Sequence, residues 1–267
     1  MPFQIFVSIV FFVYGTVIGS FLNVVICRIP KKESIVKGRS HCVSCGHTLS
    51  WTDLFPILSH LFLRGKCRYC GAKVSWRYSF VETLCGLSYA AAFIFLGLSI
   101  KLIFAIILFP ILICLSFYDI DTEEIEYWCP IGIALLGLAA LTLSILNITP
   151  TPWYEHLIGA VVVSVPFAIM SLFGAMGGAD IQLMAAAGLL MGWSIVPSAL
   201  IGIAMGSSWG IALKIVRKPE KRRVYEDDEF SMKGTVIKFG PFLAAGIAIG
   251  FLFGDVAIYW YLSLING

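Results

Sequence analysis

The chain has 267 residues, of which 59% are hydrophobic and 13% are charged, with a mean hydropathy of +0.90 and a formal net charge of +3. This composition excludes an ordinary soluble domain, in which about 25% of residues are charged. Membrane topology and attraction to anionic lipid head groups account for the small basic excess, so we expect the lipid bilayer and no nucleic acid as a partner. The fold class that this composition predicts is an all-α polytopic membrane protein.

Apolar runs near the roughly 20 residues that a spanning helix needs recur along the chain. They predict about eight transmembrane helices. Gly and Pro residues interrupt the long run that holds the sixth and seventh helices, and we expect the break near Ser194 to Ser198. The predicted spans are residues 4–27, 79–100, 102–118, 128–148, 156–173, 181–197, 198–216 and 239–264.

Basic residues predict the orientation, because Lys and Arg gather in cytoplasmic loops. Ten of the nineteen lie from Arg28 to Arg77, eight lie from Lys214 to Lys238, and Lys101 alone falls in a connection expected outside. The N-terminus is therefore predicted outside and both large loops inside. The resulting division is a first transmembrane helix (1–27), a cytoplasmic insertion (28–78) and a membrane core (79–267) that includes a charged loop at 214–238.

The insertion contains two Cys-x-x-Cys pairs, Cys42 with Cys45 and Cys67 with Cys70, separated by 21 residues and each followed by Gly. This spacing is typical of a four-thiolate zinc site. Two disulfides are the alternative, but a cytoplasmic loop is a reducing environment, which favours the metal. Because four sulfur ligands leave no position for water, we expect a structural Zn²⁺ that stabilises an insertion with little apolar mass.

Two acidic residues lie where apolar helices are predicted to leave the membrane. Asp119 follows the third span, and Asp180 closes a glycine-rich run at 174–180. An ionisable group beside hydrocarbon is costly and marks a candidate functional site. Two such carboxylates can share one proton and activate a water. Two alternatives stay open: Asp180 as the cap of a helix beginning at Ile181, and Asp121 in place of Asp119 as the partner of Asp180.

Five further blocks of sequence, spread in order over nearly the whole chain, carry a family resemblance. They are residues 15–30, 49–59, 64–71, 77–82 and 239–243. Together with the Cys pairs and the two acidic motifs, they resemble the type IV prepilin peptidase (prepilin leader peptidase) family of membrane aspartic proteases. The order and extent of the match make it more specific than any one motif.

The two acidic motifs match the family pattern with departures. In the family, one catalytic Asp heads Asp-x5-Ile/Leu-Pro-Asp/Asn, which Asp119 matches as far as Ile125, and then Glu126–Tyr127 departs. The other closes Gly-x-Gly-Asp, where Ala179 replaces the last Gly before Asp180, and Gln182 stands where a Lys usually follows. We expect the local geometry to survive if Ala179 need not adopt a positive φ.

The resemblance implies both an enzymatic function and a cellular location. It implies that Asp119 and Asp180 are catalytic, that the protein lies in the bacterial inner (cytoplasmic) membrane, and that it cleaves type IV prepilin or pseudopilin precursors at the cytoplasmic face. It also implies N-methylation of the new N-terminus with S-adenosylmethionine, with cofactor-binding residues unknown. Acidic residues between the third and fourth spans are expected to attract the basic leader of the substrate over short range. They are Asp121, Glu123, Glu124 and Glu126.

Three other classes of protein were weighed against this interpretation. A presenilin or signal-peptide-peptidase relative also uses two membrane Asp residues, but the chain has no Pro-Ala-Leu motif and the zinc loop has no place there. A proton-coupled transporter would place its carboxylates near the bilayer midplane, often between inverted repeats. In a non-enzymatic, zinc-dependent membrane assembly factor, the insertion would bind a partner and the Asp residues would be incidental.

Overall fold

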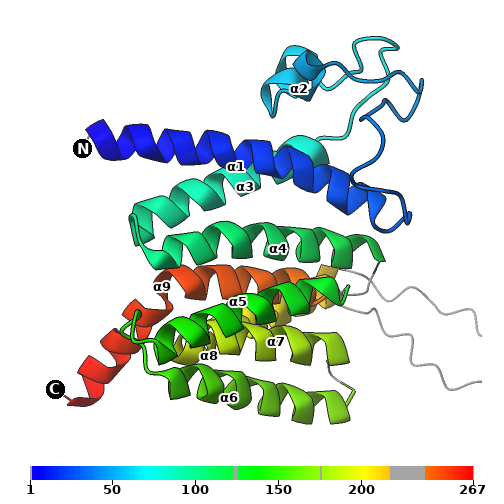
Figure 1. Ribbon diagram of the computed structural model, residues 1–267. Coiled ribbons are helices and arrows are strands. Elements are labelled where there is room, and N and C mark those ends of the chain that lie inside the picture. Colours follow the sequence, from blue (N-terminus) through cyan, green and yellow to red (C-terminus); the bar gives the residue numbers. More distant parts are fainter. Residues whose placement is uncertain (1, 123–125, 175, 217–237, 267) are drawn as a thin grey trace, which may run out of the picture.

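The computed structural model describes residues 2–122, 126–174, 176–216 and 238–266, and within these ranges the regular structure is helical, with no strands (Figure 1). This confirms the predicted all-α membrane class. The short elements are η1 (Trp51–Leu54), α2 (Leu58–Phe62) and η2 (Gly192–Ser194). The long helices are α1 (Pro2–Arg28), α3 (Arg77–Leu96), α4 (Ile100–Thr122), α5 (Trp128–Ile145), α6 (Trp153–Leu172), α7 (Gly178–Met191), α8 (Ile195–Val216) and α9 (Gly240–Asn266).

The long helices lie side by side in one bundle with two distinct ends (Figure 1). One end carries the insertion between α1 and α3, the C-terminus of α4 and the first residue of α9, and is called the loop end. The opposite end carries the two chain termini and is called the terminus end. Consecutive long helices run in opposite directions (Figure 1). Short connections impose this from α3 to α8.

Seven apolar helical stretches are long enough to cross a membrane in the described part of the chain, and one of them, Gly178–Leu213, contains both α7 and α8. The chain reverses between these helices at Gly192, whose φ of 58° an L side chain rarely adopts. Contacts along α8 show the reversal. Gly254 of α9 lies against Ser194, whereas Gly206 packs on the ring of Phe239 at the loop end. The predicted break therefore exists, but it lies at Gly192–Ser194, just before the expected position.

Helices α3 and α4 both contribute to each of the two hydrophobic clusters of the described bundle. The larger cluster joins α4, α5, α7 and α9 through residues such as Leu108, Leu183 and Ile247. The smaller one joins α1, α3 and α4 through residues such as Val81 and Cys114. Helix α4 therefore links the helix pair that carries the insertion to the rest of the bundle.

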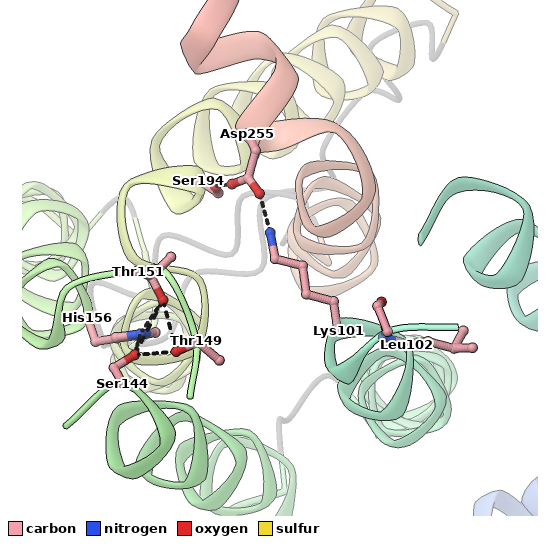
Figure 2. A network of polar contacts seen from close by, with 9 residues as sticks. Lys101, Leu102, Ser144, Thr149, Thr151, His156, Ser194 and Asp255 are labelled. Carbon is pink, nitrogen blue, oxygen red and sulfur yellow. Dashed lines mark hydrogen bonds and ion pairs between the residues drawn. The ribbon is translucent and has the colours of Figure 1, made fainter. Parts of the chain in front are cut away.

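A polar network at the terminus end joins α4, η2 and α9 (Figure 2). Lys101 at the start of α4 forms an ion pair with Asp255 of α9, and Asp255 also accepts a hydrogen bond from the hydroxyl of Ser194. Both charged side chains are about half exposed. This carboxylate therefore has a cation and a hydroxyl donor as partners, which is the usual state of a structural carboxylate in a membrane protein.

A second, buried network lies beside it and ties α5, α6 and α7 together (Figure 2). His156 Nδ1 lies 2.9 Å from the carbonyl oxygen of Leu189, and Nε2 lies 2.9 Å from the hydroxyl of Ser144. Because a carbonyl only accepts, Nδ1 carries the proton and Nε2 accepts from Ser144. Leu189 is in the last turn of α7, so His156 satisfies a carbonyl that the helix itself leaves without a partner.

Candidate active site and metal centre

Asp119 lies near the C-terminal end of α4 and is only 5% exposed. Its Oδ2 accepts a hydrogen bond of 3.1 Å from the backbone N–H of Gly240, the first residue of α9. A Cβ added at Gly240 would lie 2.7 Å from that same oxygen, so only glycine permits this approach. The carboxylate thus sits at a helix N-terminus, where N–H groups and the helix dipole stabilise negative charge.

Asp180 lies in the first turn of α7 and is 8% exposed. Its Oδ2 accepts a hydrogen bond of 3.2 Å from the N–H of Gly177, the residue that precedes the helix. This contact is the one that the third helical residue makes to the N-cap backbone in a capping box. Asp180 is therefore not the N-cap of a helix beginning at Ile181, because α7 begins at Gly178 and its N-cap is Gly177. Asp180 also interacts electrostatically with Asp119. The structure therefore brings together, at the loop end, two buried carboxylates that are 61 residues apart in sequence.

Ala179, the departure beside Asp180, is accommodated without backbone strain. It is not among the residues with positive φ in the described chain. The condition stated for Ala179, that it need not adopt a positive φ, is therefore met. Gln182, which stands where the family has a cation, is exposed on α7. Among the described residues, Asp180 forms no ion pair with a basic side chain.

The residues around Asp119 have other partners. Asp121 is exposed and receives two hydrogen bonds from the guanidinium of Arg77, of 2.9 and 2.5 Å. Glu126, which departs from the family pattern, accepts a hydrogen bond from the hydroxyl of Tyr118. Lys238 donates to the carbonyl of Ile120 at 2.5 Å. Two of the acidic residues expected to attract a basic leader, Glu123 and Glu124, lie outside the described residues.

Sequence reasoning missed the contact between Gly240 and Asp119, because it joins residues 121 positions apart. The only signal was a Gly followed by Pro at the start of the last span, in a block noted solely for its family resemblance. A Gly at a helix start allows close approach of another group, and Pro is favoured at the first helical positions. Such a pair facing an acidic helix end is a usable clue.

The four predicted metal ligands, Cys42, Cys45, Cys67 and Cys70, converge in the insertion. Their sulfur atoms all lie within 4.8 Å of one another, and Cys42 and Cys70 are 3.9 Å apart. A tetrahedral ion with metal–sulfur distances of about 2.3 Å requires sulfur separations of about 3.8 Å, so the arrangement fits such an ion. All four thiols are free of disulfides. A Cys₄ cluster able to bind a metal ion is therefore present.

Equivalent turns build the two halves of this cluster. The N–H of Gly46 donates to Cys42 O at 2.8 Å, and the N–H of Gly71 donates to Cys67 O at 2.9 Å. Both glycines have positive φ, 69° and 73°, which explains the Gly after each pair. Each turn thereby presents two sulfurs on one side.

The electrostatics of the thiols also suit a cation. Hydrogen bonds from the backbone of Cys45 and Ser44 lower the pKa of Cys42 to about 6. At Cys70 the N–H of Ala72 favours the thiolate, but burial and the neighbouring cysteine sulfurs outweigh it and raise the pKa to about 11. Four thiolates so close together repel one another, and a divalent cation is what allows all of them to ionise.

Asp53 connects the two halves of the insertion. Burial opposes its ionisation, but hydrogen bonds from the Ser50 side chain and backbone and from the Tyr69 hydroxyl, with the charge of Arg68, leave its pKa below the usual value. The ion pair from Arg68 Nε to Asp53 measures 2.7 Å. Since Ser50 follows the first Cys pair and Tyr69 lies within the second, this carboxylate holds the two together.

Two known protein families match most of the chain. Residues 13–96 match the family described as the bacterial peptidase A24 N-terminal domain, and residues 106–211 match the type IV leader peptidase family. The first match covers α1, the insertion and α3. The second runs from α4 into α8 and contains both Asp119 and Asp180.

Comparison with curated proteins gives relatives of similar length. The chain is 31% identical over 261 residues to the prepilin leader peptidase/N-methyltransferase of Bacillus subtilis (strain 168), covering 97% of this chain and 99% of that one. It is 35% identical over 209 residues to the protein of the same name from Myxococcus xanthus (strain DK1622), covering 75% and 60%. For the one from Aeromonas salmonicida (strain A449), the identity is 30% over 287 residues, covering 95% and 93%. No solved structure matches. The chain thus belongs to the type IV leader peptidase family.

Proposed function

We propose that this protein is a membrane aspartic endopeptidase that removes the leader peptide of type IV prepilin-like precursors, with Asp119 and Asp180 as its catalytic pair. The observation that carries the proposal is the meeting of two buried carboxylates from α4 and α7 at the loop end, each hydrogen-bonded to an N–H group at a helix start. The curated relatives, all named prepilin leader peptidases, support the choice of substrate.

The pair supplies the groups that peptide hydrolysis needs. Two like charges at close range do not both ionise readily, so one carboxyl carries a proton while the other is a carboxylate. The carboxylate takes a proton from water as the water oxygen attacks the scissile carbonyl, and the protonated partner donates its proton to the carbonyl oxygen. The proton taken from water then passes to the leaving nitrogen as the C–N bond breaks. The other carboxylate takes a hydroxyl proton from the collapsing intermediate, which leaves a carboxylic acid product and restores the singly protonated pair. The N–H groups of Gly177 and Gly240 hold the two side chains in place during these transfers.

The environment of Asp121 supports the choice of Asp119, and not Asp121, as the catalytic partner of Asp180. A catalytic carboxylate must exchange a proton with the reacting groups, whereas a bidentate contact with Arg holds a carboxylate ionised. Asp121 is exposed and forms such a contact with Arg77, while Asp119 is buried beside Asp180. Asp121 then fixes the end of α4 to α3, next to the pair.

The second proposed activity is N-methylation of the new N-terminus, for which S-adenosylmethionine supplies the methyl group. Support comes from the printed names of the relatives, which join both activities. No residues are assigned to this cofactor. The metal of the Cys₄ cluster is proposed to be Zn²⁺ with a structural role, because four sulfur ligands complete a tetrahedral shell.

The proposed setting is the bacterial inner membrane, with the N-terminus outside and the loop end in the cytoplasm. The positive-inside distribution of Lys and Arg supports this orientation, since the basic insertion emerges at the loop end. The division into residues 1–27, 28–78 and 79–267 is retained as part of the proposal. Precursors would approach through the membrane, with their apolar helix beside the bundle and their basic leader at the cytoplasmic face.

The experiment is cleavage of a purified prepilin in liposomes by the wild type and by Asp119→Asn, Asp121→Asn and Asp180→Asn, read by mass spectrometry with S-adenosylmethionine present. We expect cleavage to fall by roughly 10²–10⁴-fold in the Asp119 and Asp180 variants, and to persist in the Asp121 variant. A further mass gain of one methyl group on the product tests the second activity. Normal cleavage by all three variants would exclude the pair and leave the assembly-factor alternative.

A further inference from the structure

The insertion exposes several large apolar side chains close together in sequence. They lie in η1, in α2 and between them, are exposed to 74%, 51%, 45%, 62% and 80%, and are called the apolar edge: Trp51, Phe55, Leu58, Leu61 and Phe62. Scattered exposed apolar residues are ordinary, but a cluster of this size marks a surface that contacts a membrane or another protein. Neither the metal cluster nor the proposed catalytic pair accounts for it.

The junction between η1 and α2 is fixed at a defined depth along the bundle. The N–H of Ile57 donates to Glu82 Oε2 at 2.8 Å, and Glu82 is five residues into α3 from Arg77. Five helical residues rise by about 7 Å, so Ile57 lies beside the second turn of α3 and not beyond its end. Ile57 also has a φ of 59°, which a β-branched residue adopts only where its surroundings impose it.

The apolar edge is therefore level with side chains that face the membrane. Figure 1 shows α2 alongside the bundle near the loop end of α1, with α1 and α3 between it and α4. On α1, Val17 and Phe21 are 51% and 52% exposed, and Phe80 of α3 is 59% exposed. Helix α2 itself packs mainly against η1. In a bilayer that covers these exposed side chains, a surface at this depth would lie near the boundary between lipid head groups and acyl chains.

A groove of about 200 Å³ runs along the apolar edge and combines apolar walls with a polar rim. Its lining includes Phe55, Leu58, Phe62 and Leu63, with Thr52 and Arg68 at the rim. The Arg68 side chain is 50% exposed and contacts Asp53 through Nε. Three further basic residues lie within five positions of Arg68 in sequence: Arg64, Lys66 and Lys73. Apolar walls beside basic groups suit an acyl chain and the phosphate of an anionic phospholipid.

We propose that the apolar edge lies in the head-group region of the leaflet at the loop end and binds anionic phospholipid there. The insertion is then held at two points, by Glu82 on the bundle side and by lipid on the other. This second attachment fixes the position of the metal cluster relative to the bundle. The proposal does not depend on the catalytic assignment.

The experiment places the photoreactive residue benzoylphenylalanine at Phe62 of the full-length, metal-loaded protein in vesicles of phosphatidylethanolamine and phosphatidylglycerol. Val17 on α1 is the positive control, and Val43, 85% exposed on the first Cys turn, is the matched negative control within the insertion. After illumination, mass spectrometry should detect phospholipid adducts at position 62 as strongly as at position 17, enriched in phosphatidylglycerol, and several-fold fewer at position 43.

Variants at Glu82 test whether lipid cross-linking at position 62 depends on the hydrogen bond to Ile57 or reflects non-specific reaction of an exposed apolar position. Glu82→Ala removes the acceptor for Ile57 and should lower the adduct yield at position 62, whereas Glu82→Gln keeps an acceptor and should preserve it. Adducts at position 17 without any at position 62 would overturn the proposal, provided that metal content and melting temperature match the wild type. Cross-links from position 62 to another segment of this chain, or to an added prepilin in place of lipid, would overturn it equally. Benzoylphenylalanine at Phe55, also in the apolar edge, gives an independent second probe.

Discussion

The partners of Asp255 at the terminus end differ from those of Asp119 and Asp180 at the loop end. Asp121, also at the loop end, is paired with Arg77 much as Asp255 is paired with Lys101. At the terminus end, Asp255 has the cation of Lys101 and the hydroxyl of Ser194 as partners. At the loop end, Asp119 and Asp180 interact with each other, and each accepts a hydrogen bond from a backbone N–H group at the start of a helix. A carboxylate paired with a cation can stabilise a fold. Two neighbouring carboxylates repel each other and lower stability, and such pairs are characteristic of active sites.

Removing the metal is expected to have the largest effect and to act on the loop end alone. Zinc binding supplies about 10–16 kcal/mol of apparent free energy in small four-ligand sites, so a chelator, or Cys67→Ser, should unfold the insertion. Limited proteolysis should then cut within residues 29–76 while the helices of the bundle stay protected. Cuts spread equally over the bundle would show that the two regions do not fold separately.

Gly240→Ala tests the approach of α9 to Asp119 without changing any charge. The new Cβ would lie 2.7 Å from Asp119 Oδ2, and a displacement of about 1 Å at a reacting group can cost 10²-fold in rate. We expect prepilin cleavage to fall by about that factor. Gly178→Ala at the start of α7 is the control, because its Cβ would meet no atom within 4 Å. Equal rates for the two variants would contradict the geometry.

The terminus end should respond in stability and not in cleavage. His156→Phe removes the present partner of the Leu189 carbonyl, whereas the Ser144 hydroxyl keeps its contacts with threonine hydroxyls. A buried polar group left unsatisfied costs about 1–3 kcal/mol. Thermal unfolding should therefore shift downward, while cleavage at low temperature stays unchanged. Lys101→Met, at a half-exposed ion pair, should cost about 1 kcal/mol or less. A larger loss for Lys101→Met than for His156→Phe would reverse this ranking.

Acid should weaken the insertion through Asp53. Its pKa is lower in the folded state, so its contribution is fully present above the unfolded value of about 3.9 and is lost as the pH falls through the folded value. Asp53→Asn should destabilise residues 50–69 at neutral pH by about 1 kcal/mol, with the difference from wild type disappearing below about pH 3. Hydrogen exchange at both pH values measures this, and a difference that persists in acid would rule out the ionised carboxylate as the cause.

Ala179→Gly should have the smallest effect. Ala179 lies in the first turn of α7 without positive φ, so the glycine gains nothing from its conformational freedom and should cost roughly 0.5–1 kcal/mol of stability. Cleavage should be unchanged within the error of the assay. A clear rise in cleavage rate would mean that the alanine constrains the pair after all.

What the sequence predicted follows from local chemistry. Hydrophobic runs sufficed for the long helices, and the two Cys-x-x-Cys turns with their glycines sufficed for the metal cluster, because these features depend on neighbouring residues. The break between α7 and α8 was predicted a few residues late, since several Gly and Pro residues in that run offered alternatives to Gly192. The catalytic roles of Asp119 and Asp180 stay a prediction.

The contacts that could not be predicted from the sequence join residues far apart in the chain. Gly240 against Asp119, Arg77 against Asp121 and Glu82 against Ile57 depend on how helices pack, which one sequence does not reveal. These three contacts also carry most of the functional argument. They distinguish Asp119 from Asp121 and fix the depth of the insertion.

The most direct measurement compares Asp119→Asn with Asp255→Asn in the same liposome preparation, with prepilin cleavage and thermal unfolding read on each. The account predicts that Asp119→Asn abolishes cleavage and keeps or raises the melting temperature, because it relieves repulsion with Asp180. Asp255→Asn should lower the melting temperature and keep cleavage. If Asp119→Asn cleaves like the wild type, or if both variants lose cleavage only in proportion to lost stability, the division between a catalytic and a structural end is wrong.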